Sequence, residues 1–283
     1  MGKLSLAAKI THVPSMFISE MPGPHHGCRQ PAIDGLTEIG RRCDALGVDT
    51  IVVFDTHWLV NTAYHINARE RYAGIYTSNE FPHFIQDLAY DYRGAPDLGD
   101  EIARLVSAEG IRMMAHHVDT LEPEYGTLVP MRYINADGRF RVLSIVAWCP
   151  WHEMEESFRI GRAVRRAIEE GGCNAAILAS GSLSHRIHDN NAAPAGIHTI
   201  SDEFYRQVDL RVLDLWRAGR NEEFVKMLPL YSRLCHGEGF MHDTAMLFGA
   251  LGGDGYDGRA EILTDYFTSS GTGQVNAVFP LAA

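Results

Sequence analysis

The chain has 283 residues and a formal net charge of −11 with histidine neutral; 46% of its residues are hydrophobic and 22% are charged. These proportions are ordinary for a globular protein, and they exclude the collagen-like, disordered and disulfide-scaffold classes. No run of Lys and Arg interrupts the acidic balance, so we expect neither nucleic acid nor a membrane as a partner.

The cysteines and the apolar stretches predict a cytoplasmic protein. Five cysteines are widely spaced and form no C-x-x-C pair, which is typical of reduced thiols. No stretch approaches the roughly 20 apolar residues of a membrane span. The N-terminal residues become polar too early for a signal peptide.

The first part of the chain has a strand–helix–strand pattern. Residues 4–11 are an apolar run that ends at a histidine and a proline, as a buried strand does. Apolar residues then recur at helical spacing over 31–46, followed by Gly47, which suits the C-terminal cap. The β-branched run at 50–55 fits a strand buried on both faces. We expect a parallel crossover unit here.

The same alternation continues to the end of the chain. We expect helices at residues 98–109, 155–170, 202–216, 222–228 and 241–251, and strands at 140–147, 174–180, 261–267 and 275–279. The sequence contains neither a linker nor a convincing internal repeat. It predicts an α/β fold in which residues 1–283 form a single catalytic domain, with a central mixed β-sheet and helices on both faces.

Three of the predicted strands run into a histidine. His12 directly follows residues 4–11, His57 follows 50–55, and His185 comes a few residues after 174–180. Ligands of open α/β sheets gather at the carboxyl ends of the strands. One histidine in such a place is more often structural, so the prediction of a site depends on all three lying at one edge.

A candidate carboxylate comes late in the chain, where Glu238 stands between Gly237 and Gly239. Flanking glycines permit a tight turn and a close approach, which a ligand loop needs, although an exposed turn has the same pattern. Two histidines and a carboxylate without a nearby thiolate suit a divalent metal with open positions. Non-haem iron(II) oxygenases and zinc hydrolases both use such a set, and composition does not separate them.

Short segments in a fixed order carry a family resemblance. They are ITHVP at residues 10–14, FDTHW at 54–58, YTSNE at 76–80, EYG at 124–126, SGSLSH at 180–185, GEG at 237–239 and SSGTGQVNAVFP at 269–280. With these segments the chain resembles, over essentially its whole length, the class III extradiol ring-cleavage dioxygenases. This is the family of proteins similar to the β-subunit of protocatechuate 4,5-dioxygenase.

The resemblance implies a mononuclear Fe(II) cofactor held by His12, His57 and Glu238. It places His185 in the second sphere as an acid/base, and Tyr125 where family members carry His or Tyr beside the substrate. The implied reaction is extradiol cleavage of a catechol by O₂, with 3,4-dihydroxyphenylacetate as the first candidate and another catechol or 2-aminophenol as alternatives. It also implies a homo-oligomer.

The substrate itself sets further expectations. A catechol loses a proton on binding a metal, and a histidine with a reference pKa of ~6.5 can accept it near neutral pH. Trp58 is a candidate for an apolar wall beside the ring, and Arg186, Ser269 and Ser270 are candidates for contact with the acetate arm. Two other classes stay open: a metallohydrolase with the same ligands, and a binding protein that has lost its metal.

Overall fold

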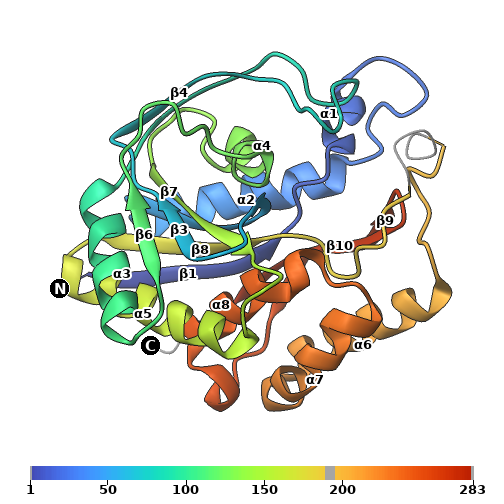
Figure 1. Cartoon of the computed structure of the whole chain (residues 1–283). Helices are drawn as coiled ribbons and strands as arrows, with labels where there is room; N and C mark the ends of the chain where they lie inside the picture. Colours follow the sequence, from blue (N-terminus) through green and yellow to red (C-terminus); the bar gives the residue numbers. More distant parts are fainter. Residues whose placement is uncertain (1, 189–194, 282–283) are drawn as a thin grey trace.

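The computed structural model describes residues 2–188 and 195–281, so both ends of the expected 1–283 domain lie outside the described residues. Its centre is an eight-stranded sheet with the order β6-β3-β7-β2-β8-β1-β10-β9 (Figure 1). Parallel pairs join β7, β2, β8 and β1, whereas β10 is antiparallel to both β1 and β9. The predicted mixed sheet is confirmed. The six strands from β7 to the edge strand β9 are β1 (Lys3–Ile10), β2 (Thr50–Leu59), β7 (Arg141–Trp148), β8 (Asn174–Ser180), β9 (Glu261–Ser269) and β10 (Thr272–Phe279).

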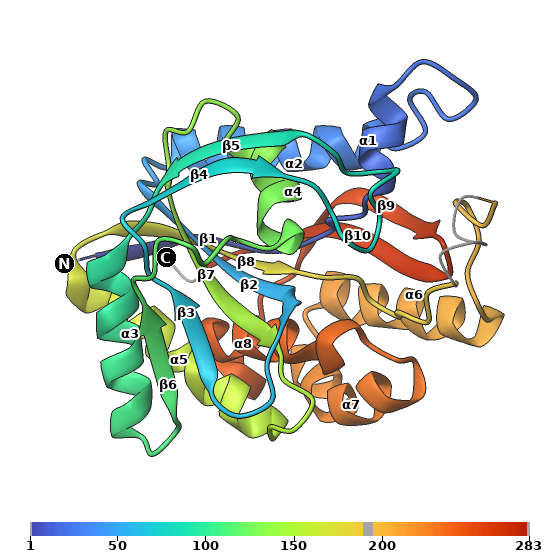
Figure 2. The same ribbon diagram turned by 45° about the horizontal axis from the view of Figure 1, so that its top comes forward.

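Helices cover both faces of the sheet, as the sequence predicts. Figures 1 and 2 show α2 (Gln30–Ala45) and α4 (Tyr125–Ile134) on one face, and α3 (Pro96–Ala108), α5 (Met154–Gly171) and α8 (His242–Leu251) on the other. Two hydrophobic cores result. Because side chains alternate along a strand, Val52 and Phe54 of β2 enter one core while Ile51 and Val53 enter the other.

Smaller elements complete the chain. They are α1 (Ser15–Glu20), β3 (Tyr64–Asn67), β6 (Met113–His116), the separate β4 (Arg71–Tyr76) and β5 (Leu88–Arg93) pair, α6 (Glu203–Ala218), α7 (Asn221–Leu234), and the 3₁₀ turns η1 (Glu238–Met241) and η2 (Gly253–Gly255). Within the described residues, no helix is long and apolar enough to cross a membrane.

Three features of the chain differ from the sequence-based expectation. β1 and β2 are parallel but not neighbours, because β8 lies between them and pairs with both. β2 continues past residue 55 to Leu59, so His57 lies inside the strand. The helix predicted to end at 228 continues through Pro229 to Leu234, because Pro229 is exposed while Tyr231 and Ser232 extend the buried face.

Candidate metal centre

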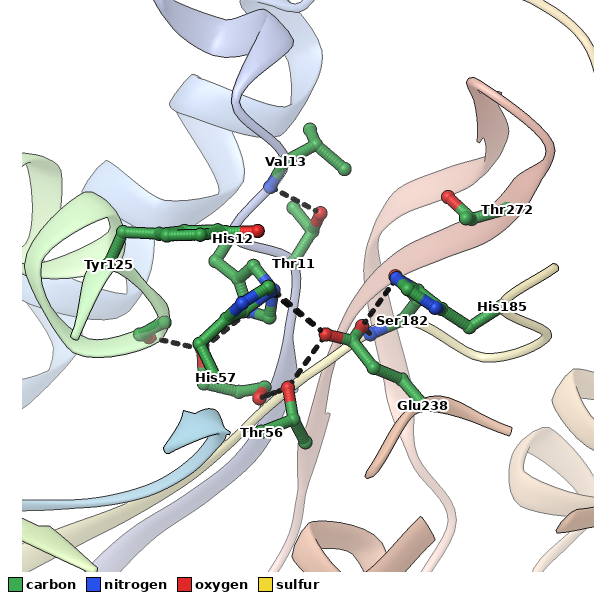
Figure 3. Close-up of polar contacts among 12 residues, drawn as sticks. Thr11, His12, Val13, Thr56, His57, Tyr125, Ser182, His185, Glu238 and Thr272 are labelled. Carbon is green, nitrogen blue, oxygen red and sulfur yellow. Dashed lines mark hydrogen bonds and ion pairs between the residues drawn. The ribbon is translucent and has the colours of Figure 1, made fainter. Parts of the chain in front are cut away.

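The sheet order brings the predicted histidines to one place. β2, β8 and β1 are adjacent and parallel, so their carboxyl ends meet at one edge. His12 follows β1, His57 lies near the end of β2, and His185 lies in the segment after β8. Glu238 reaches the same place from η1 (Figure 3). The candidate ligand atoms of His12, His57 and Glu238 all lie within 4.8 Å of one another.

One carboxylate oxygen is shared by two imidazoles. Oε1 of Glu238 lies 3.1 Å from Nε2 of His12 and 3.3 Å from Nε2 of His57. Nε2 of His185 faces the other oxygen, Oε2, at 3.8 Å. His12, His57 and Glu238 therefore surround one point, and His185 stands beside it with its side chain about a quarter exposed.

Ser180, at the end of β8, fixes which nitrogen of His12 carries a proton. Its hydroxyl donates to the carbonyl of Gly126 at 2.5 Å, because that carbonyl can only accept. Ser180 Oγ must then accept from Nδ1–H of His12, at 3.0 Å. Nε2 of His12 keeps its lone pair and points to Glu238, which is the tautomer that a metal ligand needs.

His57 is held by its backbone and by a ring contact. Its amide donates to Oδ1 of Asp55 at 2.8 Å, and Oδ2 of Asp55 accepts from Thr127 Oγ1 at 2.6 Å. A Cβ on Gly126 would lie 2.1 Å from Asp55 Oδ1, so only glycine fits there. The same turn carries Tyr125, whose ring centroid lies 3.7 Å from that of His57.

The turn that carries Glu238 has an unusual backbone. Gly239, Phe240 and Met241 have φ of 55°, 59° and 63°, a conformation that costs energy for residues other than glycine. A Cβ on Gly239 would lie 2.7 Å from the carbonyl oxygen of Ala147. The strained turn is stabilised from outside, since the Glu238 amide donates to Leu183 O at 3.3 Å.

Asp209 of α6 anchors the segment that leads to His185. Its carboxylate accepts hydrogen bonds from the hydroxyls of Ser184 at 2.7 Å, Tyr231 at 2.7 Å and Tyr266 at 2.8 Å. Burial raises the pKa of Asp209 to about 6, although these hydrogen bonds act in the opposite direction. The residue that precedes His185 is therefore tied to three other elements.

Glu238 is a buried carboxylate that lacks a Lys or Arg partner within the described part of the chain. The nearby cation Lys9 is itself fully buried and pairs with Asp243. Glu238 accepts from Thr56 Oγ1 at 2.8 Å and from the Ser182 amide, which leaves further lone pairs free. Two imidazole nitrogens and an uncompensated carboxylate at one point fit a divalent cation, which would supply the missing positive charge.

The pKa shifts of Glu238, His185 and Tyr125 indicate different roles for these three side chains. Burial by itself raises the pKa of Glu238, but the nearby histidines hold that pKa well below its ordinary value, so it is a carboxylate. Burial lowers the pKa of His185, which favours the neutral imidazole, although the charge of Glu238 acts in the opposite direction. Burial and then the charges of Glu80 and Glu238 raise the pKa of Tyr125, so its phenol stays protonated.

Two cavities adjoin the centre, and both are lined by His57 and His185. The first, here called the serine cavity, is also lined by Tyr125 and by the hydroxyl residues Ser15, Ser269 and Ser270. The second is also lined by His242, Trp148, Phe240 and Glu238. An aromatic diol bound at the centre would therefore meet both apolar and hydroxyl walls.

The predicted substrate-binding residues lie in different surroundings. Ser269 and Ser270 line the serine cavity. Arg186 is exposed and Trp58 packs near His65 and His116, and neither residue is among those lining the two cavities. Their contact with substrate stays a prediction.

Several residues around the centre carried no signal in the sequence. Thr56, Ser180 and Ser182 contact the side chains of the candidate ligands only because distant segments meet, although all three lie at or near strand ends. Ser15 lies three residues after His12, and this closeness along the chain is too weak a signal to select it. Hydroxyl side chains are too common in loops to be selected by pattern.

Fold and site together define an α/β protein with a candidate His₂Glu metal site at the carboxyl edge of its sheet. The family model for the catalytic LigB subunit of aromatic ring-opening dioxygenase matches residues 6–280. The chain belongs to this family, which confirms the resemblance seen in the sequence, and it is an oxidoreductase of the metal-dependent ring-opening class.

Individual relatives agree with this assignment. The chain is 54% identical to 3,4-dihydroxyphenylacetate 2,3-dioxygenase of Escherichia coli over 270 aligned residues. The alignment covers 95% of this chain and 98% of that protein. It is 28% identical to the 2-aminophenol 1,6-dioxygenase beta subunit of a Pseudomonas species, over 66% of this chain and 64% of that one. An uncharacterised protein of Escherichia coli K12 shares the fold, with a TM-score of 0.65 at 15% identity, over 98% of this chain and 100% of that chain.

Proposed function

We propose that the protein opens the ring of 3,4-dihydroxyphenylacetate next to the diol, with O₂, to give 2-hydroxy-5-carboxymethylmuconate semialdehyde. Both oxygen atoms of O₂ enter the product, so no separate reductant is consumed. The 54% identity to a relative named for this substrate, over 95% of the chain, carries the proposal. The convergence of His12, His57 and Glu238 supports it.

The proposed cofactor is Fe(II), held by Nε2 of His12, Nε2 of His57 and a carboxylate oxygen of Glu238. An Fe(II) ion held by these residues would supply a single centre able to bind the diol and activate O₂. The chain contributes the geometry: Ser180 orients His12, and the Asp55 contact to the His57 amide fixes the end of β2.

His185 is proposed to move the proton. Its Nε2 is neutral because burial lowers its pKa, so it can accept a proton from a catechol hydroxyl and later return it to the opened product. Tyr125 is proposed to act differently, because burial raises its pKa and keeps the phenol protonated. Its phenol, which lies 3.3 Å from Glu80 Oε2, acts as a hydrogen-bond donor and its ring orients His57.

We further propose that residues 1–283 act as one catalytic domain, in a cytoplasmic homo-oligomer. The family model spans residues 6–280 without interruption, which supports a single domain. Gel filtration with light scattering tests the oligomer; a mass equal to one chain at all concentrations would contradict it.

The experiment that tests the function is O₂ uptake together with the yellow ring-opened product. Purified protein loaded with Fe(II) under anaerobic conditions is mixed with 3,4-dihydroxyphenylacetate, other catechols and 2-aminophenol. We expect one O₂ per ring and the highest kcat/KM with 3,4-dihydroxyphenylacetate. Zinc-loaded protein is the control, because a hydrolase would work with zinc and without O₂. Absence of O₂ uptake with every catechol would refute the proposal.

A further inference from the structure

Arg29 is a buried cation that has no acidic partner among the residues that the structure describes. It precedes α2, is 3% exposed, and its guanidinium lies 5.0 Å from the ring centroid of Phe267. Among residues 2–188 and 195–281, no carboxylate lies within ion-pair distance of it. Burial lowers the pKa of Arg29, which shows the cost of keeping this charge inside the protein. An unpaired buried charge is expensive, so its retention calls for a physical reason.

A chain of hydroxyl groups leads away from Arg29. Its Nε lies 2.9 Å from Ser15 Oγ, and Ser15 Oγ lies 3.1 Å from Ser269 Oγ. A guanidinium can only donate, so Ser15 accepts from Arg29. Either hydroxyl of the Ser15–Ser269 pair can be the donor. When Ser15 donates to Ser269, the O–H of Ser269 is left free to donate to a ligand.

The free end of this chain lies at the metal centre. Ser15 and Ser269 both line the serine cavity, together with His12, His57 and His185. Apart from Ser15, the described residues offer the Ser269 hydroxyl no hydrogen-bond acceptor. A hydroxyl polarised by a cation two hydrogen bonds away is a strengthened donor, which suits an anionic acceptor.

We propose that Arg29 is a positioning residue that makes the serine cavity selective for catechols with a carboxylate arm. It acts through Ser15 and Ser269, whose hydroxyl donates to the substrate carboxylate, while the buried charge supplies the favourable potential. The inference rests on the proposed ring-cleavage function and names the source of its substrate selectivity. It assigns that charge to Arg29 and not to the exposed Arg186 beside His185.

Arg29 also has structural contacts, and the test must separate the two roles. One guanidinium nitrogen donates to the carbonyl of Ile197, and its backbone amide donates to Ser19 Oγ at 2.8 Å. Loss of a purely structural contact would impair every substrate equally. Loss of the charge would weaken only substrates that carry a carboxylate.

The test compares 3,4-dihydroxyphenylacetate with the uncharged 4-methylcatechol, by steady-state kinetics and by anaerobic calorimetry of binding. We expect Arg29→Gln to raise KM and Kd for 3,4-dihydroxyphenylacetate about tenfold or more, because a charge-assisted contact is lost. The values for 4-methylcatechol should change less than about twofold. Arg29→Lys should restore part of the preference, and Arg186→Gln, the matched control, should keep all of it.

A second variant tests the proposal even if Arg29→Gln does not fold. Ser15→Ala combined with Ser269→Ala removes the hydrogen bonds between Arg29 and the cavity while Arg29 stays in place. It should lose the same preference for the substrate with a carboxylate. The proposal would be overturned if either variant weakened the binding of both substrates equally. It would also be overturned if Arg186→Gln lost the preference for the carboxylate substrate while Arg29→Gln and the double serine variant kept it. If the wild-type protein opens no catechol, the proposed function fails; the binding preference still tests Arg29, and an unchanged preference in Arg29→Gln refutes it.

Discussion

Replacement of Ser180 by alanine tests the link between the sheet and the metal centre. Ser180 is fully buried at the end of β8 and stands between Gly126 O, at 2.5 Å, and His12 Nδ1, at 3.0 Å. The alanine side chain removes both contacts without adding volume. The His12 ring then loses the group that holds its proton on Nδ1 and its lone pair on Nε2.

Ser180→Ala should have two separate effects, one on the free energy of unfolding and one on metal affinity. The buried Nδ1–H and the Gly126 carbonyl each lose a partner, which costs about 1–3 kcal/mol of the free energy of unfolding per group left unsatisfied. Loss of an outer-sphere partner of a metal-binding histidine typically lowers metal affinity about 10- to 100-fold. We expect both changes in Ser180→Ala, with His57 and Glu238 still in place.

The measurement is a competition titration of Fe(II) against a chelator, with urea unfolding of the metal-free protein beside it. Ser157→Ala is the matched control, because Ser157 is also buried and lies 2.7 Å from His242 Nδ1. It breaks an equivalent serine–histidine contact at a histidine outside the His₂Glu set. We expect the control to lose stability but to bind Fe(II) like the wild type.

A specific result would refute this reasoning. If Ser180→Ala binds Fe(II) with wild-type affinity although its unfolding free energy falls, His12 does not depend on Ser180 for its tautomer. If Ser157→Ala weakens Fe(II) binding as much as Ser180→Ala does, the effect is general destabilisation and says nothing of ligand orientation.

Three further predictions concern the carboxylate, the proton and a buried acid. Glu238→Ala should lose stoichiometric metal and activity together; metal analysis that finds full occupancy would remove Glu238 from the ligand set. His185→Phe should retain metal and substrate binding, while kcat falls about 10²- to 10⁴-fold; turnover at the wild-type rate in a stopped-flow assay would disprove its proton transfer. Burial raises the pKa of Asp209 from its ordinary 3.8 to about 6, so the folded protein favours the protonated acid. Its contribution to the free energy of unfolding is present below about pH 4 and is lost as pH rises through 6, by roughly 3 kcal/mol at most. Urea unfolding at pH 4.5 and 7 should therefore show a larger decline for the wild type than for Asp209→Asn, and equal declines would contradict the raised pKa.

Most of the sheet could be predicted from local pattern. The runs at residues 4–11, 50–55, 140–147 and 174–180 are apolar enough to be buried on both faces, and each is a strand in the structure. The short β3 and β6 were not predicted, because four residues give too little periodicity. α4 was missed as well, since Pro130 within it argues against a helix until its packing is known.

The order of the strands in the sheet could not be predicted from the sequence. Residues 4–11 and 50–55 form parallel strands, but β8, more than a hundred residues later, lies between them. Pairing of distant strands depends on which apolar faces pack together over the whole chain, and no local window contains that information. The same holds for η1, whose left-handed backbone at Phe240 and Met241 is stabilised by contacts from elsewhere.

The sequence by itself determined the residue types at the site: three histidines at or after the ends of predicted strands and a glycine-flanked acid, in the order of a known family. Only the tertiary structure decided their geometry, since it alone brings Glu238 within 3.1 Å of His12 and places His185 beside both. It also decided the supporting contacts of Ser180 and the burial of the charge of Arg29. The sequence specifies which side chains are present, whereas their proximity, their burial and the direction of their hydrogen bonds arise only when distant segments pack together.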